Sequence, residues 1–289
     1  MKKVLITGAN SYIGTSFEKY VSQNDSFLVD TIDMIDGSWE NSDFSEYDTV
    51  FHVAGIAHSD SGKISEEKAK LYYSVNTDLT EKVAIKCKKD GVSQFIYMSS
   101  MIVYGASSKM GEIKMIDDKT VPKPENAYGD SKLQAEIKLN RLVDDSFKVV
   151  ILRPPMIYGK GSKGNYPVLS KYAKKLPIFP NVDNQRSMLY IENLCEFIKL
   201  MVENEEQGTF MPQNSSYTKT SEMVKVIADV SGNNIILTRI FNLPLRLISP
   251  IVGVVNKVFG SLAYDMSISE YEKEYRVVGF NESIKRTER

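Results

Sequence analysis

The fold of this chain is indicated near its start, by the stretch Lys2-Lys-Val-Leu-Ile-Thr-Gly-Ala-Asn-Ser-Tyr-Ile-Gly14. Its first part, up to Thr7, is apolar after two lysines and predicts a short buried strand. A turn with glycines follows, and the residues from Thr15 to Gln23 have a helical pattern. A strand, a glycine turn and a helix in this order are the context that a dinucleotide-binding fingerprint requires.

The two glycines of this turn have different expected roles. Gly8 permits the tight turn, and Gly14 lets the helix pack closely on the sheet, with the helix N-terminus facing a pyrophosphate. Ser11 stands where a middle glycine usually lets the backbone approach the phosphates. We expect Ser11 either to weaken pyrophosphate binding or to donate its hydroxyl to a phosphate. The turn residues expected to bind the cofactor are Gly8, Asn10, Ser11, Tyr12, Ile13 and Gly14.

An acidic residue follows the second expected strand, which runs from Phe27 to Ile32. Asp33 lies 19 positions after Gly14, where a carboxylate would bind the adenosine ribose hydroxyls. No Arg or Lys follows closely to attract a 2′-phosphate, so the sequence favours NAD over NADP. Asp30 competes for the ribose role, and in the plainest alternative both acids merely end a strand.

Strand-like and helix-like stretches alternate through the first 155 residues. Further strands are expected at Thr49–Val53, Gln94–Ser99 and Lys148–Leu152, and helices at Ser65–Lys89 and Tyr128–Leu142. This alternation predicts an α/β fold, a Rossmann doubly wound parallel sheet with helices on both faces. In such sheets ligands bind at the carboxyl ends of the strands.

The pattern loosens after Pro155 and suggests a second domain. We expect residues 1–155 to form a dinucleotide-binding domain and residues 156–289 to form mainly a smaller substrate domain. A helix near residues 191–202 is expected to return to the first domain, and another covers Ser221–Val230.

The composition excludes several functional classes. The chain has 289 residues, 42% of them apolar and 25% charged, as in ordinary soluble proteins. Its net charge is −1 without a dense basic block, so a nucleic-acid partner is not expected. No signal peptide is recognised, and Cys87 and Cys195 are expected to be isolated thiols, as in a cytoplasmic protein. His52 and His58 have no zinc-like neighbours, and we expect no metal.

One segment, Ile240–Phe259, is apolar and about long enough to span a bilayer. It contains Pro244, Arg246, Pro250 and Lys257, which disfavour a spanning helix. We therefore predict a helical pair packed on the protein or serving as a partner surface, without stable membrane insertion. Contact with a membrane surface remains an alternative.

A candidate catalytic pair occurs in the run Asn126-Ala-Tyr-Gly-Asp-Ser-Lys132. Tyr128 and Lys132 are four residues apart and share one face of a helix. A Lys ammonium beside a phenol would lower the pKa of the phenol, which could then take or give a proton while a hydride moves elsewhere. The alternative is an exposed amphipathic helix on which the spacing arises by chance.

Other motifs complete a recognisable set. They are Asp43-Phe44, His52-Val-Ala-Gly55, Asn76 and Met98-Ser-Ser-Met-Ile-Val-Tyr-Gly105. Together with the N-terminal turn and the Tyr/Lys pair, they resemble an extended short-chain dehydrogenase/reductase of the NAD-dependent epimerase/dehydratase family. The resemblance runs nearly end to end and concerns members that modify nucleotide sugars in polysaccharide biosynthesis.

The resemblance implies specific roles for these residues. Tyr128 would be the catalytic base, Lys132 would lower its pKa and bind the nicotinamide ribose, and Ser100 would hold the sugar oxygen. Asp43 and Phe44 would lie near the adenine. The remaining residues implied to bind the cofactor are Val53, Ala54, Gly55, Asn76, Ser99 and Pro155.

Departures from the family pattern narrow the expected activity. Met101 and Ile102 replace the acidic pair of the 4,6-dehydratases, so dehydration is disfavoured. Ser100 and Met101 are expected at the sugar, and by resemblance Asn165 and Arg186 would hold the diphosphate. The alternative for Arg186 is a surface ion pair.

The resulting expectation is an NAD-dependent 4-epimerase of a UDP-hexose or UDP-N-acetylhexosamine. A 4-keto-reductase of a UDP-sugar and a non-catalytic dinucleotide-binding sensor or scaffold remain alternatives. Family resemblance also implies a homodimer, formed through the helical stretches Ile64–Lys89 and Tyr128–Leu142.

Overall fold

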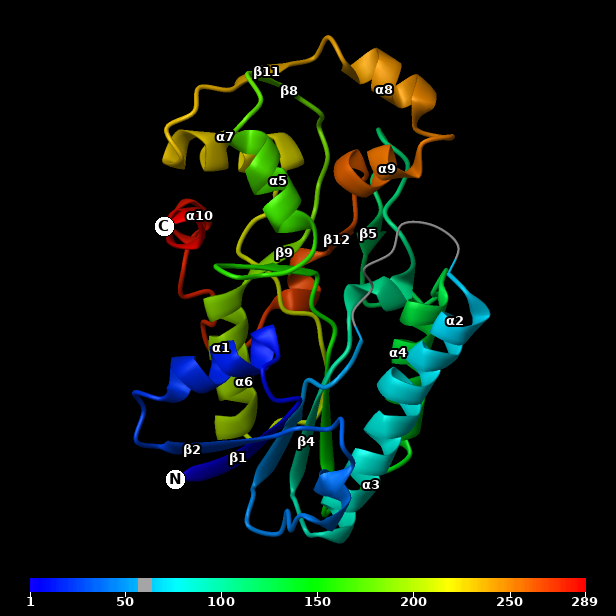
Figure 1. Ribbon diagram of the computed structural model, residues 1–289, viewed down its shortest axis with the longest axis vertical. Helices are drawn as coiled ribbons and strands as arrows, with labels where there is room; N and C mark the ends of the chain where they lie inside the picture. The colour runs from blue at the N-terminus through cyan, green and yellow to red at the C-terminus, as the bar shows by residue number, and fades with distance from the viewer. Residues whose placement is uncertain (57–63) are drawn as a thin grey trace. The chain divides into compact units, whose positions relative to one another are not determined.

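The computed structural model of the chain describes residues 1–56 and 64–289. His58 therefore lies outside the described residues. The contacts along the chain divide it into two units (Figure 1). Unit 1 comprises Met1–Gly105, Pro122–Pro154 and Leu194–Pro212, and unit 2 comprises Ala106–Val121, Pro155–Asn193 and Gln213–Arg289. The binding roles expected for the two parts of the chain remain predictions.

A parallel sheet forms the centre of unit 1, in the strand order β10-β6-β4-β3-β1-β2. Its strands are β1 (Lys2–Thr7), β2 (Phe27–Ile32), β3 (Thr49–His52), β4 (Gln94–Met98), β6 (Lys148–Leu152) and β10 (Gly208–Phe210). The predicted α/β Rossmann fold is confirmed. The short strand β10 was not anticipated, because three residues carry too little periodicity to be recognised.

Helices cover both faces of this sheet because alternate strand side chains point to opposite sides. Leu5 and Val50 pack in one core with Val83. On the other face, the rings of Phe17 and Phe51 lie 5.5 Å apart, edge to face. The helices of unit 1 are α1 (Tyr12–Val21), α2 (Glu66–Tyr73), α3 (Thr80–Lys89), α4 (Ala127–Asn140) and α6 (Ile191–Glu203), the last belonging to unit 1 from Leu194 onward.

The helix expected over Ser65–Lys89 is continuous but not uniform. A π-helical segment, η2 (Ser74–Leu79), separates α2 from α3. Such wide turns are rare and frequently occur at functional sites. Asn76 lies in this segment with its side chain completely buried, so the irregular turn coincides with a tertiary contact that periodicity cannot reveal.

Unit 2 is built from short elements. Its strand pairs are β5 (Met115–Ile116) with β12 (Ala263–Tyr264), β7 (Met156–Tyr158) with β9 (Met188–Tyr190), and β8 (Ile178–Pro180) with β11 (Ile236–Thr238). Its helices are α5 (Asn165–Ala173), α7 (Thr220–Val230), α8 (Asn242–Ile248), α9 (Gly253–Phe259) and α10 (Phe280–Glu288). Three single 3-10 turns complete the chain, at η1 (Ser38–Asn41), η3 (Met101–Tyr104) and η4 (Met266–Ser269).

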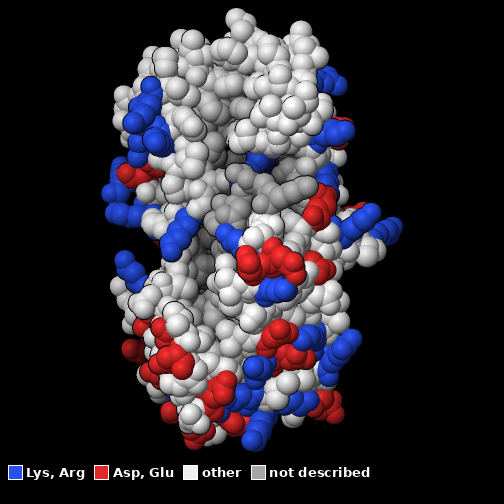
Figure 2. Space-filling view, turned by 45° about the vertical axis from the view of Figure 1, so that its right-hand side comes forward, with Lys and Arg blue, Asp and Glu red and all other residues white. Residues whose placement is uncertain are grey.

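The segment Ile240–Phe259 forms the helical pair predicted from the sequence, as α8 and α9. Each of these helices has seven residues. Within residues 1–56 and 64–289, no helix has the length and apolar character needed to cross a membrane. In Figure 2, the upper end of the molecule, where Figure 1 places α8, is largely free of charged side chains.

Candidate active site

The sheet of unit 1 contains a switch point between β1 and β3. The chain passes from β1 to β2 on one side of β1 and then returns to β3 on the other. In open α/β sheets, ligands bind beyond the carboxyl ends of the strands at such a point. The turns that follow β1 and β3 meet here, because a Cβ on Gly8 would lie 2.8 Å from the backbone nitrogen of Ala54.

The glycine turn has the geometry that the sequence predicted. Gly8 has a φ of 101°, which L side chains rarely adopt, and its backbone approach to Ala54 leaves no room for one. Asn10 also adopts a left-handed conformation, with a φ of 62°. A Cβ on Gly14 would meet Ile6 at 3.0 Å, so this glycine does permit close packing of α1 on the sheet.

Ser11 is the N-cap of α1. Its Oγ accepts a hydrogen bond from the backbone nitrogen of Gly14, at 3.1 Å. Capping leaves the Ser11 hydroxyl hydrogen able to donate, so both expectations for this residue stay predictions. Tyr12 and Ile13 form the first turn of α1, and the hydroxyl of Tyr12 is buried without a hydrogen-bond partner among the described residues.

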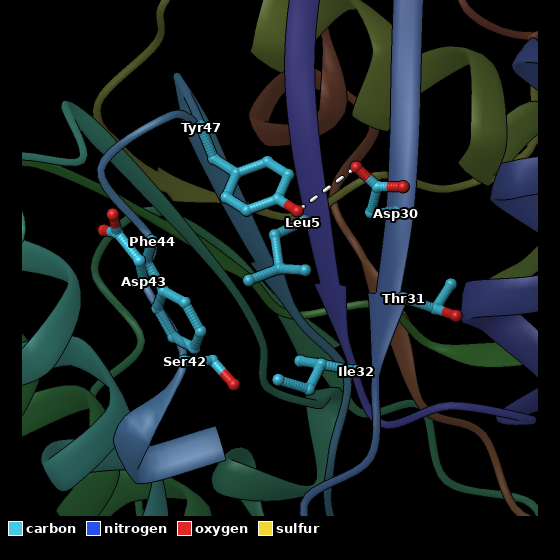
Figure 3. A pocket seen from close by; sticks show the side chains of 8 residues that line it. All are labelled: Leu5, Asp30, Thr31, Ile32, Ser42, Asp43, Phe44 and Tyr47. Atoms are coloured by element: carbon cyan, nitrogen blue, oxygen red, sulfur yellow. Dashed lines mark hydrogen bonds between the residues drawn. The ribbon is translucent and has the colours of Figure 1, made fainter. Parts of the chain in front are cut away.

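A pocket of about 190 Å³ lies beside the end of β2 (Figure 3). Its lining residues are Leu5, Asp30, Thr31, Ile32, Ser42, Asp43, Phe44 and Tyr47. Asp43 and Phe44, expected near the adenine, are therefore at this pocket, Asp43 exposed and Phe44 with a buried ring.

The two candidate ribose acids are now distinguished by their surroundings. Asp30 lies inside β2 and accepts a hydrogen bond from the Tyr47 hydroxyl at 3.1 Å (Figure 3). Asp33 lies just beyond β2 and is exposed. Its carboxylate accepts a hydrogen bond from the backbone N–H of Ile35, at 3.0 Å. The position of Asp33 after the strand end suits the ribose role better than that of Asp30.

Asn76 holds the segment that follows β3. Its Oδ1 accepts a hydrogen bond from the backbone N–H of Ile56, at 2.8 Å. Its Nδ2 donates hydrogen bonds to the carbonyl oxygen of Ile56 and to the hydroxyl of Ser131. These bonds join the loop after Val53-Ala-Gly55 to α4. Asn76 thus contributes by positioning, and the direct cofactor contact implied by resemblance stays a prediction.

Tyr128 and Ser100 are brought together where α4 begins. Asn126 caps α4, its Oδ1 accepting the backbone nitrogen of Gly129 at 2.8 Å. A Cβ on Gly129 would lie 2.9 Å from the carbonyl oxygen of Ile102, so this glycine lets α4 approach the turn that carries Ser100. A side-chain hydrogen bond joins Tyr128 and Ser100. Two hydroxyls in this arrangement can bind the same substrate oxygen.

The pKa of Tyr128 differs from the sequence-based expectation. Burial raises the pKa of Tyr128 to about 12, although the hydrogen bond from Ser100 acts to lower it. The sequence predicted a lowered pKa for Tyr128, but burial outweighs every effect that acts to lower it, so the pKa lies above its usual value. The ammonium of Lys132 is directed elsewhere, to the carbonyl oxygen of Met98 at 2.9 Å, and lies 4.9 Å from the centre of the Tyr97 ring.

Lys132 is buried, and burial disfavours its charged form. Burial lowers its pKa to about 8, and the negative charge of Glu136 partly opposes this shift. The ammonium is close to the strand ends, because a Cβ on Gly55 would lie 3.4 Å from Nζ. Lys132 therefore reaches the carboxyl ends of β3 and β4, where the fold places a ligand.

A buried ion pair holds α4 in place, and this pair was not anticipated from the sequence. The Oε2 atom of Glu136 lies 2.5 Å from Nη2 of Arg153. The carboxylate of Glu136 also accepts a hydrogen bond from the hydroxyl of Ser99. Arg153 donates in turn to the Tyr104 hydroxyl at 2.6 Å. The available signal was periodic: Tyr128, Lys132 and Glu136 follow one another at intervals of four on one face of α4.

His52 belongs to a buried network rather than to the chemistry. Its Nδ1 lies 2.7 Å from the hydroxyl of Thr7, and its Nε2 lies 3.0 Å from that of Thr80. Burial lowers the pKa of His52 to about 3, with a further contribution from the charge of Lys132. His52 is thus neutral at physiological pH. In the described part of the chain, no cluster of three His, Cys, Asp or Glu residues could hold a metal.

Three of the predicted site residues fall in unit 2. Pro155 begins its second segment, Asn165 opens α5, and Arg186 lies two residues before β9. Arg186 donates from Nη1 to the carbonyl oxygens of Lys257 at 2.9 Å and Gly260 at 3.2 Å. Among the described residues it forms no ion pair, and burial lowers its pKa to about 10. The surface ion pair considered for Arg186 is thus not found in the described part of the chain, and a diphosphate role for this residue remains a prediction.

Comparison with known proteins identifies the family. Residues 4–211 match the NAD dependent epimerase/dehydratase family. The chain belongs to this family. The extended short-chain dehydrogenase/reductase resemblance is thereby confirmed, and the family's dependence on NAD confirms the predicted cofactor.

Two curated relatives and one solved structure illustrate the similarity. The UDP-glucose 4-epimerase of Vibrio cholerae is 30% identical over 78% of this chain and 75% of its own. The N-acetyl-alpha-D-glucosaminyl-diphospho-ditrans,octacis-undecaprenol 4-epimerase of Escherichia coli O157:H7 is 30% identical over 71% of this chain and 64% of its own. The structure of UDP-N-acetylglucosamine 4-epimerase from Bacillus cereus matches the fold with a TM-score of 0.76, at 17% identity over 99% and 97% of the two chains.

Proposed function

We propose that this enzyme is a 4-epimerase of a sugar diphosphate conjugate, with a nucleotide sugar as its principal substrate. The observation that carries the proposal is the placement of Tyr128, Ser100 and Lys132 at the carboxyl ends of the sheet. The hydrogen bond between Tyr128 and Ser100 forms a site for one hydroxyl oxygen. The similarity to UDP-sugar 4-epimerases supports the assignment of that oxygen to carbon 4 of a hexose.

Tyr128 exchanges the proton in both halves of this reaction. When NAD is bound, its nicotinamide accepts a hydride from the sugar and returns it. Tyr128 takes the proton of the sugar hydroxyl while carbon 4 loses the hydride, which leaves a ketone. After the ketone presents its other face, Tyr128 returns the proton to the oxygen as carbon 4 regains the hydride. The result is an inverted alcohol and no net oxidation.

The protonation state of Tyr128 sets a condition on the first step. With a pKa of about 12, Tyr128 is a neutral phenol at neutral pH and is ready to donate a proton to a ketone. To accept a proton it must be stabilised as a phenolate, which needs a positive charge nearby. Lys132 would supply such a charge, and it could hold the ribose of bound NAD with a further N–H while keeping its bond to Met98. The charge of the oxidised cofactor would act in the same direction.

A sugar diphosphate linked to a polyprenol is a second candidate substrate. One curated relative acts on such a conjugate. The residue proposed for the diphosphate, Arg186, is bonded to backbone carbonyls at the end of α9, and the α8–α9 segment exposes many apolar side chains. An apolar surface beside a diphosphate residue could also receive the polyprenol of a lipid-linked sugar.

The test begins with the cofactor content of the freshly purified enzyme, measured after denaturation. Near-stoichiometric NAD, with interconversion of UDP-glucose or UDP-N-acetylglucosamine and their 4-epimers, supports the epimerase. An enzyme that lacks tightly held NAD and consumes reduced cofactor with a 4-keto sugar is a reductase instead. NAD binding without turnover of any sugar diphosphate would favour a sensor or scaffold and would refute the proposal.

A further inference from the structure

The α8–α9 segment, residues 236–259, exposes an unusual amount of apolar surface. None of the seven residues of α8 is buried, although its sequence is Asn-Leu-Pro-Leu-Arg-Leu-Ile. The exposed apolar residues of the segment have 39% to 87% of their surface accessible. They are Ile236, Ile240, Phe241, Leu243, Leu247, Ile248, Ile251, Val252 and Val254. A helix with apolar side chains and no buried face is expected to be covered by something outside the described fold.

The segment is held in place from its other side. Val255 and Phe259 of α9 are buried, and the ring of Phe259 packs 5.7 Å from that of Phe179. Asn242 donates from Nδ2 to the carbonyl oxygen of Asn181 at 2.9 Å, and this bond fixes the start of α8. The exposed side chains are therefore displayed by a supported hairpin whose inner side belongs to the core of unit 2.

The charges on the segment all have one sign. From residue 230 to residue 264 the sequence contains no Asp or Glu, whereas Arg239, Arg246 and Lys257 are exposed. Blue side chains occur at the margins of the pale upper region in Figure 2. Apolar side chains with basic residues at their borders are the composition that binds the surface of an anionic bilayer.

The length of the two helices excludes a deeper position. Seven residues of α-helix extend about 10 Å, which is a third of the hydrocarbon thickness of a bilayer. A second copy of the chain fits less well than a membrane. In a two-fold symmetric contact the same patch meets itself, so Arg239, Arg246 and Lys257 would face a patch that contains no acidic residue.

We infer that the α8–α9 segment docks this protein on the surface of an anionic membrane. Its apolar side chains enter the boundary between headgroups and acyl chains, and its three basic residues contact lipid phosphates. Arg186, bonded to the carbonyl oxygens of Lys257 and Gly260, lies at the end of the same helix. If the proposed function holds, docking brings the diphosphate residue to the membrane, but the docking itself does not depend on catalysis.

Vesicle sedimentation with the full-length chain tests the inference. Vesicles of phosphatidylcholine alone are compared with vesicles that contain phosphatidylglycerol. We expect the wild-type protein to sediment with the anionic vesicles and much less with the neutral ones. The double variant Leu247→Asp/Ile251→Asp should weaken this binding at least about tenfold, because it removes apolar burial and adds negative charge at the membrane.

Two further variants keep the test specific. Ile35→Asp changes an isoleucine that is 91% exposed, comparable to 87% for Ile251, but lies in unit 1 outside the segment. It should bind vesicles like the wild type. Arg239→Gln/Arg246→Gln keeps the apolar residues and should weaken binding to anionic vesicles about fivefold for each charge.

Three results would overturn the inference. The first is a wild-type protein that does not bind anionic vesicles. The second is equal binding by the wild type and the Leu247→Asp/Ile251→Asp variant. The third is a wild-type protein that does not bind vesicles but self-associates in analytical ultracentrifugation, where the Leu247→Asp/Ile251→Asp variant stays monomeric. That result would assign the face to a second copy of the chain. Loss of epimerase activity alone would count against the proposed function and would leave the vesicle results unaffected.

Discussion

Lys132 donates its ammonium to the carbonyl oxygen of Met98 at 2.9 Å. The side chain is thereby held at the end of β4, four residues along α4 from Tyr128, while the Tyr128 hydroxyl is bonded to Ser100. The ammonium has three N–H donors, so Lys132 can keep its bond to Met98 and also donate to the hydroxyls of a bound ribose.

Replacement of Tyr128 by Phe tests the proton-transfer role. Loss of the hydroxyl should lower kcat by a factor of about 10² to 10⁴, whereas the affinity for NAD should change little. Turnover and NAD binding are measured separately. Tyr72→Phe is the matched control, because the Tyr72 ring lies 5.6 Å from that of Tyr128 and its buried hydroxyl has no hydrogen-bond partner among the described residues. If Tyr128→Phe turned over like Tyr72→Phe, the proposed base would be wrong.

Burial of Lys132 should make stability depend on pH. The folded pKa of about 8 lies below the usual lysine pKa of 10.5, so between these values the unfolded chain binds more protons than the folded chain. The free energy of unfolding contributed by this group should therefore rise from pH 8 to pH 10.5 and be lowest below pH 8. Urea unfolding is compared for the wild type and Lys132→Met at several pH values in this range. A wild-type slope no steeper than that of the variant would contradict the shift.

Gly8 should tolerate no side chain for two separable reasons. Gly8→Ala places a Cβ 2.8 Å from the backbone nitrogen of Ala54 and adopts an unfavourable φ of 101°. Gly37→Ala provides the control, because Gly37 has a φ of 75° and no atom within 4 Å of its added Cβ. The control should cost about 1 kcal/mol from backbone strain alone. Gly8→Ala should cost clearly more and weaken NAD binding, and equal melting temperatures for the two variants would speak against the close approach of the turns.

Asp33 should determine the choice between NAD and NADP. A carboxylate at the end of β2 accepts hydrogen bonds from ribose hydroxyls and repels a 2′-phosphate. Asp33→Asn should weaken NAD binding about tenfold and reduce the preference over NADP, as measured by titration of both cofactors. Asp36→Asn is a control in the same loop, where the carboxylate is bonded to Ser38. If the Asp33→Asn variant kept the wild-type preference for NAD over NADP, another group would have to recognise the ribose.

Local patterns predicted the parts of this protein that local interactions determine. The unit from β1 to α1 could be recognised because Gly8, Gly14 and the strand before them act within a few residues of one another. The helical pair within Ile240–Phe259 could be predicted because Pro250 divides this apolar segment between the two helices. The interruption at Ser74–Leu79 could not, since the buried contacts of Asn76 reach Ile56 and Ser131, far away in the sequence.

The pKa values and ion pairs of the site were harder to predict from the sequence than the identity of its residues. The spacing of Tyr128 and Lys132 was informative, but the pKa of Tyr128 depends on burial and on the direction of the Lys132 ammonium. Neither quantity follows from the spacing. Glu136 and Arg153 were overlooked for the same reason, because their pairing requires α4 to lie against the end of β6.

The ion pair of Glu136 with Arg153 should be essential to the stability of unit 1. Glu136 is 2% exposed, and Glu136→Gln leaves the Arg153 guanidinium buried without a full counter-charge. Breaking a buried pair from one side costs about 3–5 kcal/mol, measured by urea unfolding. Glu66→Gln, which breaks an exposed pair with Lys70, should cost less than about 0.5 kcal/mol. The double variant Glu136→Gln/Arg153→Met should recover part of the loss, because the unpaired charge is then absent. If it recovered nothing, the loss would arise from Ser99 and local packing rather than from the charge.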